Sequence, residues 1–188
     1  SVTIARKTYE LPLPFFVMAT ENPLENSGVY ELPEAQVDRF LFKIIMGYPT
    51  PDEEVSILTQ NMSLQKFESF KIKAILNPKK IIELQEEVKK IHSSDVIKKY
   101  IVDIVNVSRS KEYEFSKYID YGASPRASIS IFIASKAEAL MNGRDYVVPS
   151  DVEQVSYEVL RHRLILNYQA EACLLYTSPS PRDELSSR

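Results

Sequence analysis

The chain has 188 residues, of which 44% are hydrophobic and 26% charged, so it can bury a core and global disorder is not expected. Its net charge of −3 argues against a general nucleic-acid-binding protein, which would carry a basic excess. The single cysteine, Cys173, excludes an internal disulfide framework and fits a reducing compartment, so we expect a cytoplasmic protein. The longest apolar stretches are too short to cross a bilayer, and no membrane span is expected.

The N-terminal quarter has the pattern of an α/β domain. Residues 2–4 and 8–11 alternate in polarity around Ala5-Arg6-Lys7, which predicts a short hairpin. The apolar runs Phe15–Thr20 and Phe40–Met46 predict strands buried on both faces, as in a parallel sheet. The chain begins at Ser1, without a methionine and within strand-like sequence, so we expect a cut there and not a natural terminus.

From Pro49 onward the pattern changes to helices. Five helix starts are predicted from capping residues, at Thr50, Asn77, Ser94, Ser124 and Ser150. Apolar residues at helical spacing predict the core-facing side of three of them: Ile81, Leu84, Val88 and Ile91; Ile97, Ile101, Ile104 and Val105; and Ile129, Ile133, Ala137 and Leu140. Gly143 is expected to end the helix that starts after Ser124.

We therefore predict an α/β plus all-α protein in three parts. Residues 1–48 form part of a parallel-sheet core, and residues 49–172 form a helical-bundle domain. Residues 173–188 are rich in serine and proline without periodicity, and we expect a disordered or non-native tail there.

Several common active-site patterns are absent from the sequence. Two histidines and one cysteine cannot form a zinc pattern, and four scattered glycines cannot form a phosphate-binding loop. The pair Asp52-Glu53 follows Thr50-Pro51 and not a hydrophobic strand, so it is interpreted as a helix start. No metal ligand is predicted.

Two polar positions lie beside the predicted strands. Asn22 follows one of them, where ligands of open α/β sheets bind, although Asn before Pro23 is also an ordinary turn former. Arg39 precedes the other strand, and a guanidinium there suits charge stabilisation on a transferring phosphoryl group. The alternative for Arg39 is a surface ion pair with Asp38 or Glu34.

Arg126 is the third candidate. Its spacing from Ile129 and Ile133 places it on the expected apolar stripe, at the N-terminal end of its helix. A cation is unfavourable at that end of the helix dipole unless an anion, such as a phosphate, is held there by both. The alternative is a side chain that extends past the stripe into solvent.

Four segments together resemble the MoxR group of AAA+ ATPases. They are Leu13–Pro23, Gly28–Lys43, Gly122–Ala127 and Val159–Leu164, and the resemblance covers residues 2–172. It implies that Asn22 is sensor 1, that Arg39 is an arginine finger reaching a neighbouring subunit, and that Arg126 is sensor 2. The hairpin Val2–Leu11 would correspond to the pre-sensor-1 insertion.

The resemblance also implies ATP and Mg²⁺ as cofactors, a homo-oligomeric and usually hexameric ring, chaperone-like remodelling, and partners with von Willebrand factor A domains. The phosphate-binding loop and the Mg²⁺-binding Asp-Glu strand would lie before Ser1, so this chain alone is expected not to hydrolyse ATP. The segment Lys111–Tyr121 and the tail depart from the family pattern. The alternative is a non-enzymatic, AAA+-derived interaction module.

Overall fold

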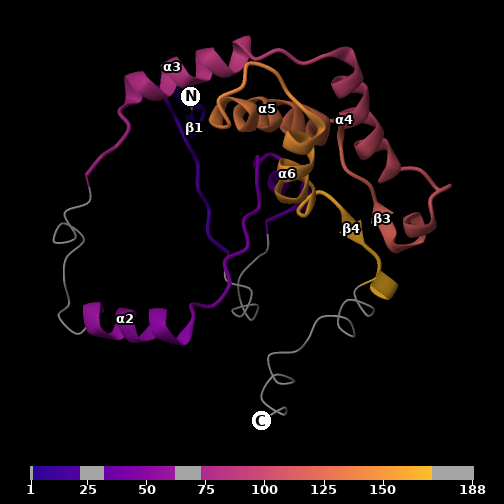
Figure 1. Ribbon diagram of the computed structural model, residues 1–188. Coiled ribbons are helices and arrows are strands. Elements are labelled where there is room, and N and C mark those ends of the chain that lie inside the picture. Colours follow the sequence, from indigo (N-terminus) through magenta and orange to yellow (C-terminus); the bar gives the residue numbers. More distant parts are fainter. Residues whose placement is uncertain (1, 22–31, 62–72, 171–188) are drawn as a thin grey trace. The chain divides into compact units, whose positions relative to one another are not determined.

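The structure is a computed structural model that describes residues 2–21, 32–61 and 73–170 (Figure 1). Contacts divide the chain into two compact units, one comprising Ser1–Thr20 with Ile44–Glu86 and the other Glu21–Lys43 with Glu87–Arg188. Each unit is described by itself. The domain boundary expected near residue 48 stays a prediction.

The first unit begins with the predicted hairpin. Strands β1 (Val2–Ile4) and β2 (Lys7–Tyr9) pair antiparallel, with Ile4 opposite Lys7. The turn consists of Ala5 and Arg6, whose φ angles of 49° and 66° both lie in the left-handed region. This is the turn geometry that usually selects Asn-Gly, and here the chain adopts it without glycine.

The two predicted buried strands are wrong for the described chain. Residues 15–20 and 41–46 form neither a helix nor a strand, and their apolar side chains are exposed, with Phe16 at 79% and Met46 at 91%. A strand is buried on both faces only when neighbouring strands and helices cover it. Among the described residues, none pairs with either run, so the apolar sequence is present without the sheet that would bury it.

Helix α2 (Pro51–Asn61) begins as predicted. The Glu53 side chain accepts a hydrogen bond from the Thr50 backbone N–H at 2.8 Å, and the Thr50 hydroxyl accepts one from the Glu53 N–H at 3.4 Å. This reciprocal capping box confirms Asp52-Glu53 as a helix start. Helix α3 (Pro78–Lys90) begins after Asn77, whose side chain accepts from the Lys80 N–H at 2.8 Å.

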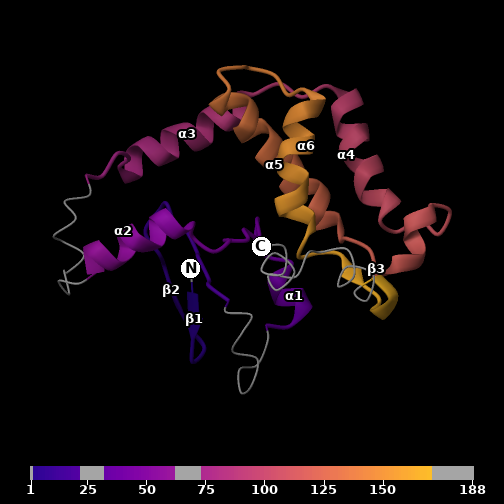
Figure 2. The ribbon, with the colours of Figure 1, turned by 60° about the horizontal axis from the view of Figure 1, so that its bottom comes forward.

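The second unit is built on three helices, α4 (Asp95–Val107), α5 (Pro125–Met141) and α6 (Pro149–Leu160), with α5 packed against both others (Figure 2). The four-residue helix α1 (Glu34–Val37), the 3-10 helix η2 (Glu114–Tyr118), and the paired strands β3 (Ile119–Tyr121) and β4 (Ile165–Leu166) complete it. Its buried apolar residues include Ile91, Ile97, Ile101, Val105, Ala127, Ile131, Val152 and Val159. The predicted α4 stripe is therefore confirmed.

The predicted stripe of α5 is wrong at Ile129 and Ile133, whereas Leu140 packs against the core as expected. Ile129 and Ile133 are 59% and 48% exposed, and the buried residues of this helix are instead Ala127, Ser130, Ile131, Ala134, Ser135 and Ala139. Most of these side chains are small, which lets α5 approach α4 and α6 closely. A stripe drawn through the large apolar residues misses such a face because close packing selects for small volume there.

The ends of α5 and α6 differ in how well the sequence predicted them. Gly143 ends α5 as expected: its φ is +69°, and the backbone N–H of Arg144 donates to the Ala139 carbonyl at 2.9 Å. Ser150 is not the cap of α6. Val148 takes that position, and the Asp151 carboxylate accepts its backbone N–H at 2.9 Å.

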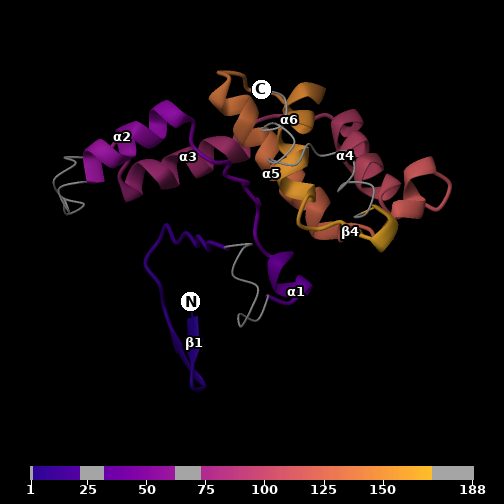
Figure 3. The same ribbon diagram turned by 90° about the horizontal axis from the view of Figure 1, so that it is seen from below.

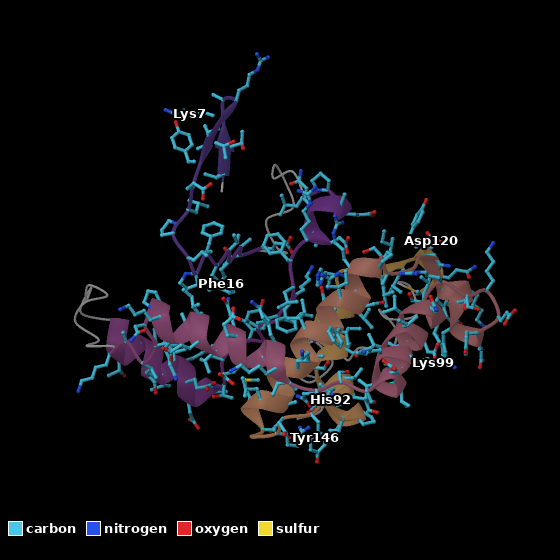
Figure 4. The ribbon with its side chains drawn as sticks, turned by 90° about the horizontal axis from the view of Figure 1, so that it is seen from above. Lys7, Phe16, His92, Lys99, Asp120 and Tyr146 are labelled. Atoms are coloured by element: carbon cyan, nitrogen blue, oxygen red, sulfur yellow. The ribbon has the colours of Figure 1, made fainter. Side chains whose placement is uncertain are left out.

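The segments flanking the helices are joined by backbone hydrogen bonds. His92 and Tyr146, which lie next to each other in Figure 4, form an isolated parallel bridge before α4 and before α6. The His92 carbonyl accepts from the Val147 N–H at 3.0 Å. Among the described residues, no helix combines the length and the apolar character needed to cross a membrane.

Candidate functional site

Asp38 directly follows α1 and is the centre of a polar cluster in the second unit. Its carboxylate accepts hydrogen bonds from Arg163 Nε, from Arg126 Nη1 and from the Ser124 hydroxyl, all at 3.0 Å. Ser124 is the N-cap of α5, and its hydroxyl also accepts the Arg126 backbone N–H at 3.2 Å. The Asp38 side chain is only 16% exposed, so these contacts are shielded from much of the solvent.

Arg163, which follows α6, holds the chain on both sides of Arg39. Its side chain is buried, and all of its nitrogens donate hydrogen bonds. Besides the Asp38 carboxylate, the acceptors are the backbone carbonyls of Asp38, Phe40, Leu41 and Val159 and the hydroxyl of Ser130. A buried guanidinium is tolerated when its donors are satisfied and a carboxylate balances its charge.

His162 adds a second contact to the same segment. Its Nε2 lies 3.0 Å from the Phe40 carbonyl and donates to it, and the backbone N–H of Lys43 donates to the Glu158 carbonyl at 3.0 Å. Burial lowers the pKa of His162, although the hydrogen bond to Phe40 opposes that shift. Nδ1 is buried without a partner among the described residues, which suits a neutral ring better than a charged one.

These contacts fix residues 38–43 to the end of α6. Figures 2 and 3 show α1 beside the end of α6 that leads into β4. Burial alone would raise the pKa of Asp38, but the hydrogen bonds from Arg126, Ser124 and Arg163 outweigh it and lower that pKa. The cluster therefore holds one ionised carboxylate against two guanidinium groups, which leaves an excess positive charge.

The predicted site residues have different positions in this arrangement. Arg126 is 57% exposed and bonded to Asp38, so it does not lie on a buried stripe. The anion expected beside it at the start of α5 is, in this structure, the Asp38 carboxylate. Arg39 is exposed, and no hydrogen bond or ion pair joins its side chain to another described residue. Asn22 lies outside the described residues.

Sequence reasoning missed the residues that connect the cluster. It considered Asp38 only as a surface partner of Arg39, whereas the carboxylate contacts Arg126 and Arg163. The spacing of four residues between Val159 and Arg163 could have predicted the role of Arg163. This spacing places both side chains on one side of a helix, and an arginine on the buried side requires a carboxylate that balances its charge.

The described residues offer contacts for ATP but no ligand set for Mg²⁺. They contain no group of three or more acidic, histidine or cysteine side chains that could hold a metal ion, so no Mg²⁺ ligand is assigned among them. Arg39 and Arg126 present exposed guanidinium groups, which suit contacts with the phosphates of a nucleotide.

Two family models match the chain. The model for the ATPase family associated with various cellular activities (AAA) matches residues 1–42, and the model for the AAA lid domain matches residues 111–184. The chain is 44% identical over 175 residues to Chaperone MoxR1 of Mycobacterium tuberculosis, covering 91% of this chain and 45% of the relative. It is 42% identical over 171 residues to Uncharacterized protein YeaC of Bacillus subtilis, covering 91% and 51%.

A solved structure gives the same result. The crystal structure of a candidate ATPase from Cytophaga hutchinsonii superposes with a TM-score of 0.78 at 38% sequence identity, covering 99% of this chain and 56% of that one. The chain thus combines part of an AAA+ core with a helical lid, the architecture of the AAA+ ATPases. Within that class it belongs to the MoxR type. It spans about half the length of the curated relatives it matches.

Proposed function

We propose that this chain is part of an ATP-hydrolysing enzyme that remodels partner proteins in a chaperone-like way. The family supports ATP as the substrate, and the name of the M. tuberculosis relative supports the chaperone-like role. The observation that carries the proposal is the exposed Arg39, on a segment that Asp38, His162 and Arg163 anchor firmly. An arginine without a described partner, on an anchored segment, can serve a site outside its own subunit.

Arg39 is the proposed arginine finger. Its guanidinium would stabilise the charge that develops on the γ-phosphoryl group bound by a neighbouring subunit, and its fork of donors suits the phosphoryl oxygens. This role requires a ring in which the Arg39 of each subunit faces the next nucleotide, and a homo-hexamer is the assembly we propose. Proteins with von Willebrand factor A domains are the proposed partners, and the cytoplasm is the proposed location.

Arg126 is the proposed sensor 2, which contacts the nucleotide from the lid. Its position at the start of α5 supports this role, because the helix N-terminus and the guanidinium attract the same anion. Asn22 is the proposed sensor 1, which would orient the attacking water. That assignment rests on the resemblance of the segment Leu13–Pro23.

The chain supplies only some of the groups that phosphoryl transfer needs. Its sequence has no glycine-rich phosphate loop and no acidic pair after a hydrophobic strand, and these elements cradle the phosphates and hold Mg²⁺. Mg²⁺, when bound, would neutralise charge between the β- and γ-phosphates. We therefore propose that the 188-residue chain by itself does not hydrolyse ATP and that the protein encoded by the complete gene does.

The test is Arg39→Ala in the protein encoded by the complete gene. ATP turnover should fall by about 10³-fold or more while ATP binding changes little, because a finger acts on the transition state. Lys98→Ala, which removes an exposed cation from α4, is the matched control and should keep turnover. Unchanged turnover in Arg39→Ala would remove this residue from the proposed role.

Mixed rings test whether Arg39 acts in trans. An Arg39→Ala subunit keeps its own nucleotide site, and an Asn22→Ala subunit keeps its finger. Mixing the two inactive variants should restore part of the turnover, because some sites combine an intact Asn22 with an Arg39 from the neighbour. No recovery in mixed rings contradicts action in trans. If the complete protein neither binds nor hydrolyses ATP, a non-enzymatic interaction module is the function that remains.

A further inference from the structure

We infer that Asp38 is a positioning residue for Arg39, and that it couples the position of this arginine to the lid helices α5 and α6. The inference rests on the proposed function, since it gives Arg39 a catalytic role. It extends that function by naming the residue that would transmit movement of the lid to the finger.

Three separate side chains anchor the Asp38 carboxylate. Asp38 Oδ2 bonds to Arg126 in the first turn of α5, and Oδ1 bonds to Arg163 beyond the end of α6. The Ser124 hydroxyl, at the cap of α5, lies 3.0 Å from both oxygens. One side chain therefore connects two lid helices with the residue directly before Arg39.

The backbone around Arg39 is fixed from both sides. Arg163 Nη2 donates to the carbonyl of Asp38 at 3.1 Å and to the carbonyl of Phe40 at 2.6 Å, and Nε donates to the Asp38 carboxylate. Arg39 thus lies between two residues that the same guanidinium holds. Its own side chain has no ion pair with a described residue, so its orientation depends on this backbone anchorage.

A nucleotide that contacts Arg126 would change only part of this coupling. Arg126 is 57% exposed, whereas the Arg163 side chain is 2% exposed. An incoming phosphate competes with Asp38 for the accessible arginine, and Asp38 keeps Arg163 and Ser124 when Arg126 leaves. The link between the Arg39 segment and α6 therefore persists, while its link to α5 is reduced to the Ser124 contact when the nucleotide takes Arg126.

The test uses the protein encoded by the complete gene and compares Asp38→Ala, Arg39→Ala and the double variant. Asp38→Ala should lower kcat by about 10- to 100-fold, the loss expected when a catalytic group is misplaced by about an ångström. The KM for ATP should not rise, since a positioning residue for a finger acts on the chemical step and the loss of Asp38 frees Arg126 for the phosphate. In the Arg39→Ala background, Asp38→Ala should cause little further loss.

Asp151→Ala is the control for a purely structural effect. Asp151 is also a carboxylate near a helix N-terminus that bonds to an arginine, Arg144, but it does not contact the Arg39 segment. Asp151→Ala should destabilise the protein. In the double variant with Arg39→Ala, the two fold-losses in kcat should be independent and should therefore multiply. If Asp38→Ala prevents folding, Asp38→Asn keeps the side-chain shape and an acceptor for Ser124, and the same cycle is measured with it.

The outcomes separate the inference from the proposed function. If Arg39→Ala leaves turnover unchanged, the proposed function fails. If Arg39→Ala abolishes turnover but the folded Asp38 variants retain kcat, only the positioning role is overturned. Effects of Asp38 and Arg39 that multiply independently also overturn it, whereas a non-additive cycle without weakened ATP affinity supports it.

Discussion

The ion pair between Asp151 and Arg144 allows a quantitative test of what stabilises the helical unit. The Asp151 side chain is 2% exposed, and its Oδ2 accepts Arg144 Nη1 at 2.7 Å and the Val148 N–H at 2.9 Å. Its Oδ1 accepts Arg144 Nη2. The hydrogen bonds from Arg144 lower the pKa of Asp151, which opposes the effect of burial.

The change Asp151→Ala removes all three interactions. Loss of one partner of a buried ion pair costs about 3–5 kcal/mol, because the other charge is left without compensation. Arg144 is 25% exposed and can turn toward water, so we expect a value near the lower limit, about 3 kcal/mol. The loss of the cap contact at the start of α6 is part of this figure.

The assay is urea unfolding of the purified chain at neutral pH, followed by far-ultraviolet circular dichroism of its helices. Asp95→Ala is the matched control, because Asp95 also lies in the first turn of a helix and bonds to a cation but is 96% exposed. It should cause a much smaller loss. A decrease below about 1 kcal/mol for Asp151→Ala would refute the assignment of this pair as a buried, stabilising contact.

Two further changes test packing and protonation in the same assay. A Cβ at Gly122 would lie 2.4 Å from the backbone carbonyl oxygen of Ser108, so Gly122→Ala should destabilise the fold by about 1–3 kcal/mol. Gly47 has open space around it, so Gly47→Ala is the control and should be nearly neutral. Equal effects of the two changes would contradict the close approach at Gly122. Burial lowers the pKa of His162 below its ordinary value of about 6.5. The unfolded chain therefore binds this proton at a higher pH than the folded chain does. The free energy of unfolding should fall as the pH drops from about 7 through the pKa of the folded state. His162→Gln should weaken that dependence, and an unchanged pH profile would show that the ring is not held neutral against the Phe40 carbonyl.

The sequence predicted local features well where a few neighbouring residues decide the conformation. The hairpin, the caps at Thr50, Asn77 and Ser94, and the end of α5 at Gly143 depend on hydrogen bonds or φ angles within about five residues. The stripe of α4 was also predictable, because large apolar residues recur there at helical spacing and are buried. The resemblance to the MoxR group supplied the family, which the comparisons confirm.

The candidate site was predictable only in its individual arginines. Arg39 and Arg126 stand in recognisable motifs, and their roles stay predictions. Their relation to each other depends on Asp38, which is 86 residues from Ser124 and 125 residues from Arg163 in the chain. Sequence spacing gives no distance for such pairs of residues, because only the packing of α5 against α6 brings the start of α5 close to the end of α6.

Burial was the other property that the sequence alone could not determine. The runs Phe15–Thr20 and Phe40–Met46 have strand-like composition, but burial requires paired neighbours, and the described chain provides none. On α5 the core takes up mostly small side chains and leaves Ile129 and Ile133 exposed, because close packing against α4 and α6 selects for small volume on that face. The sequence thus determined the family, the hairpin and most helix ends, although not the start of α6. The tertiary structure decided which faces are buried and which distant charges meet, because both depend on contacts between elements far apart in the chain.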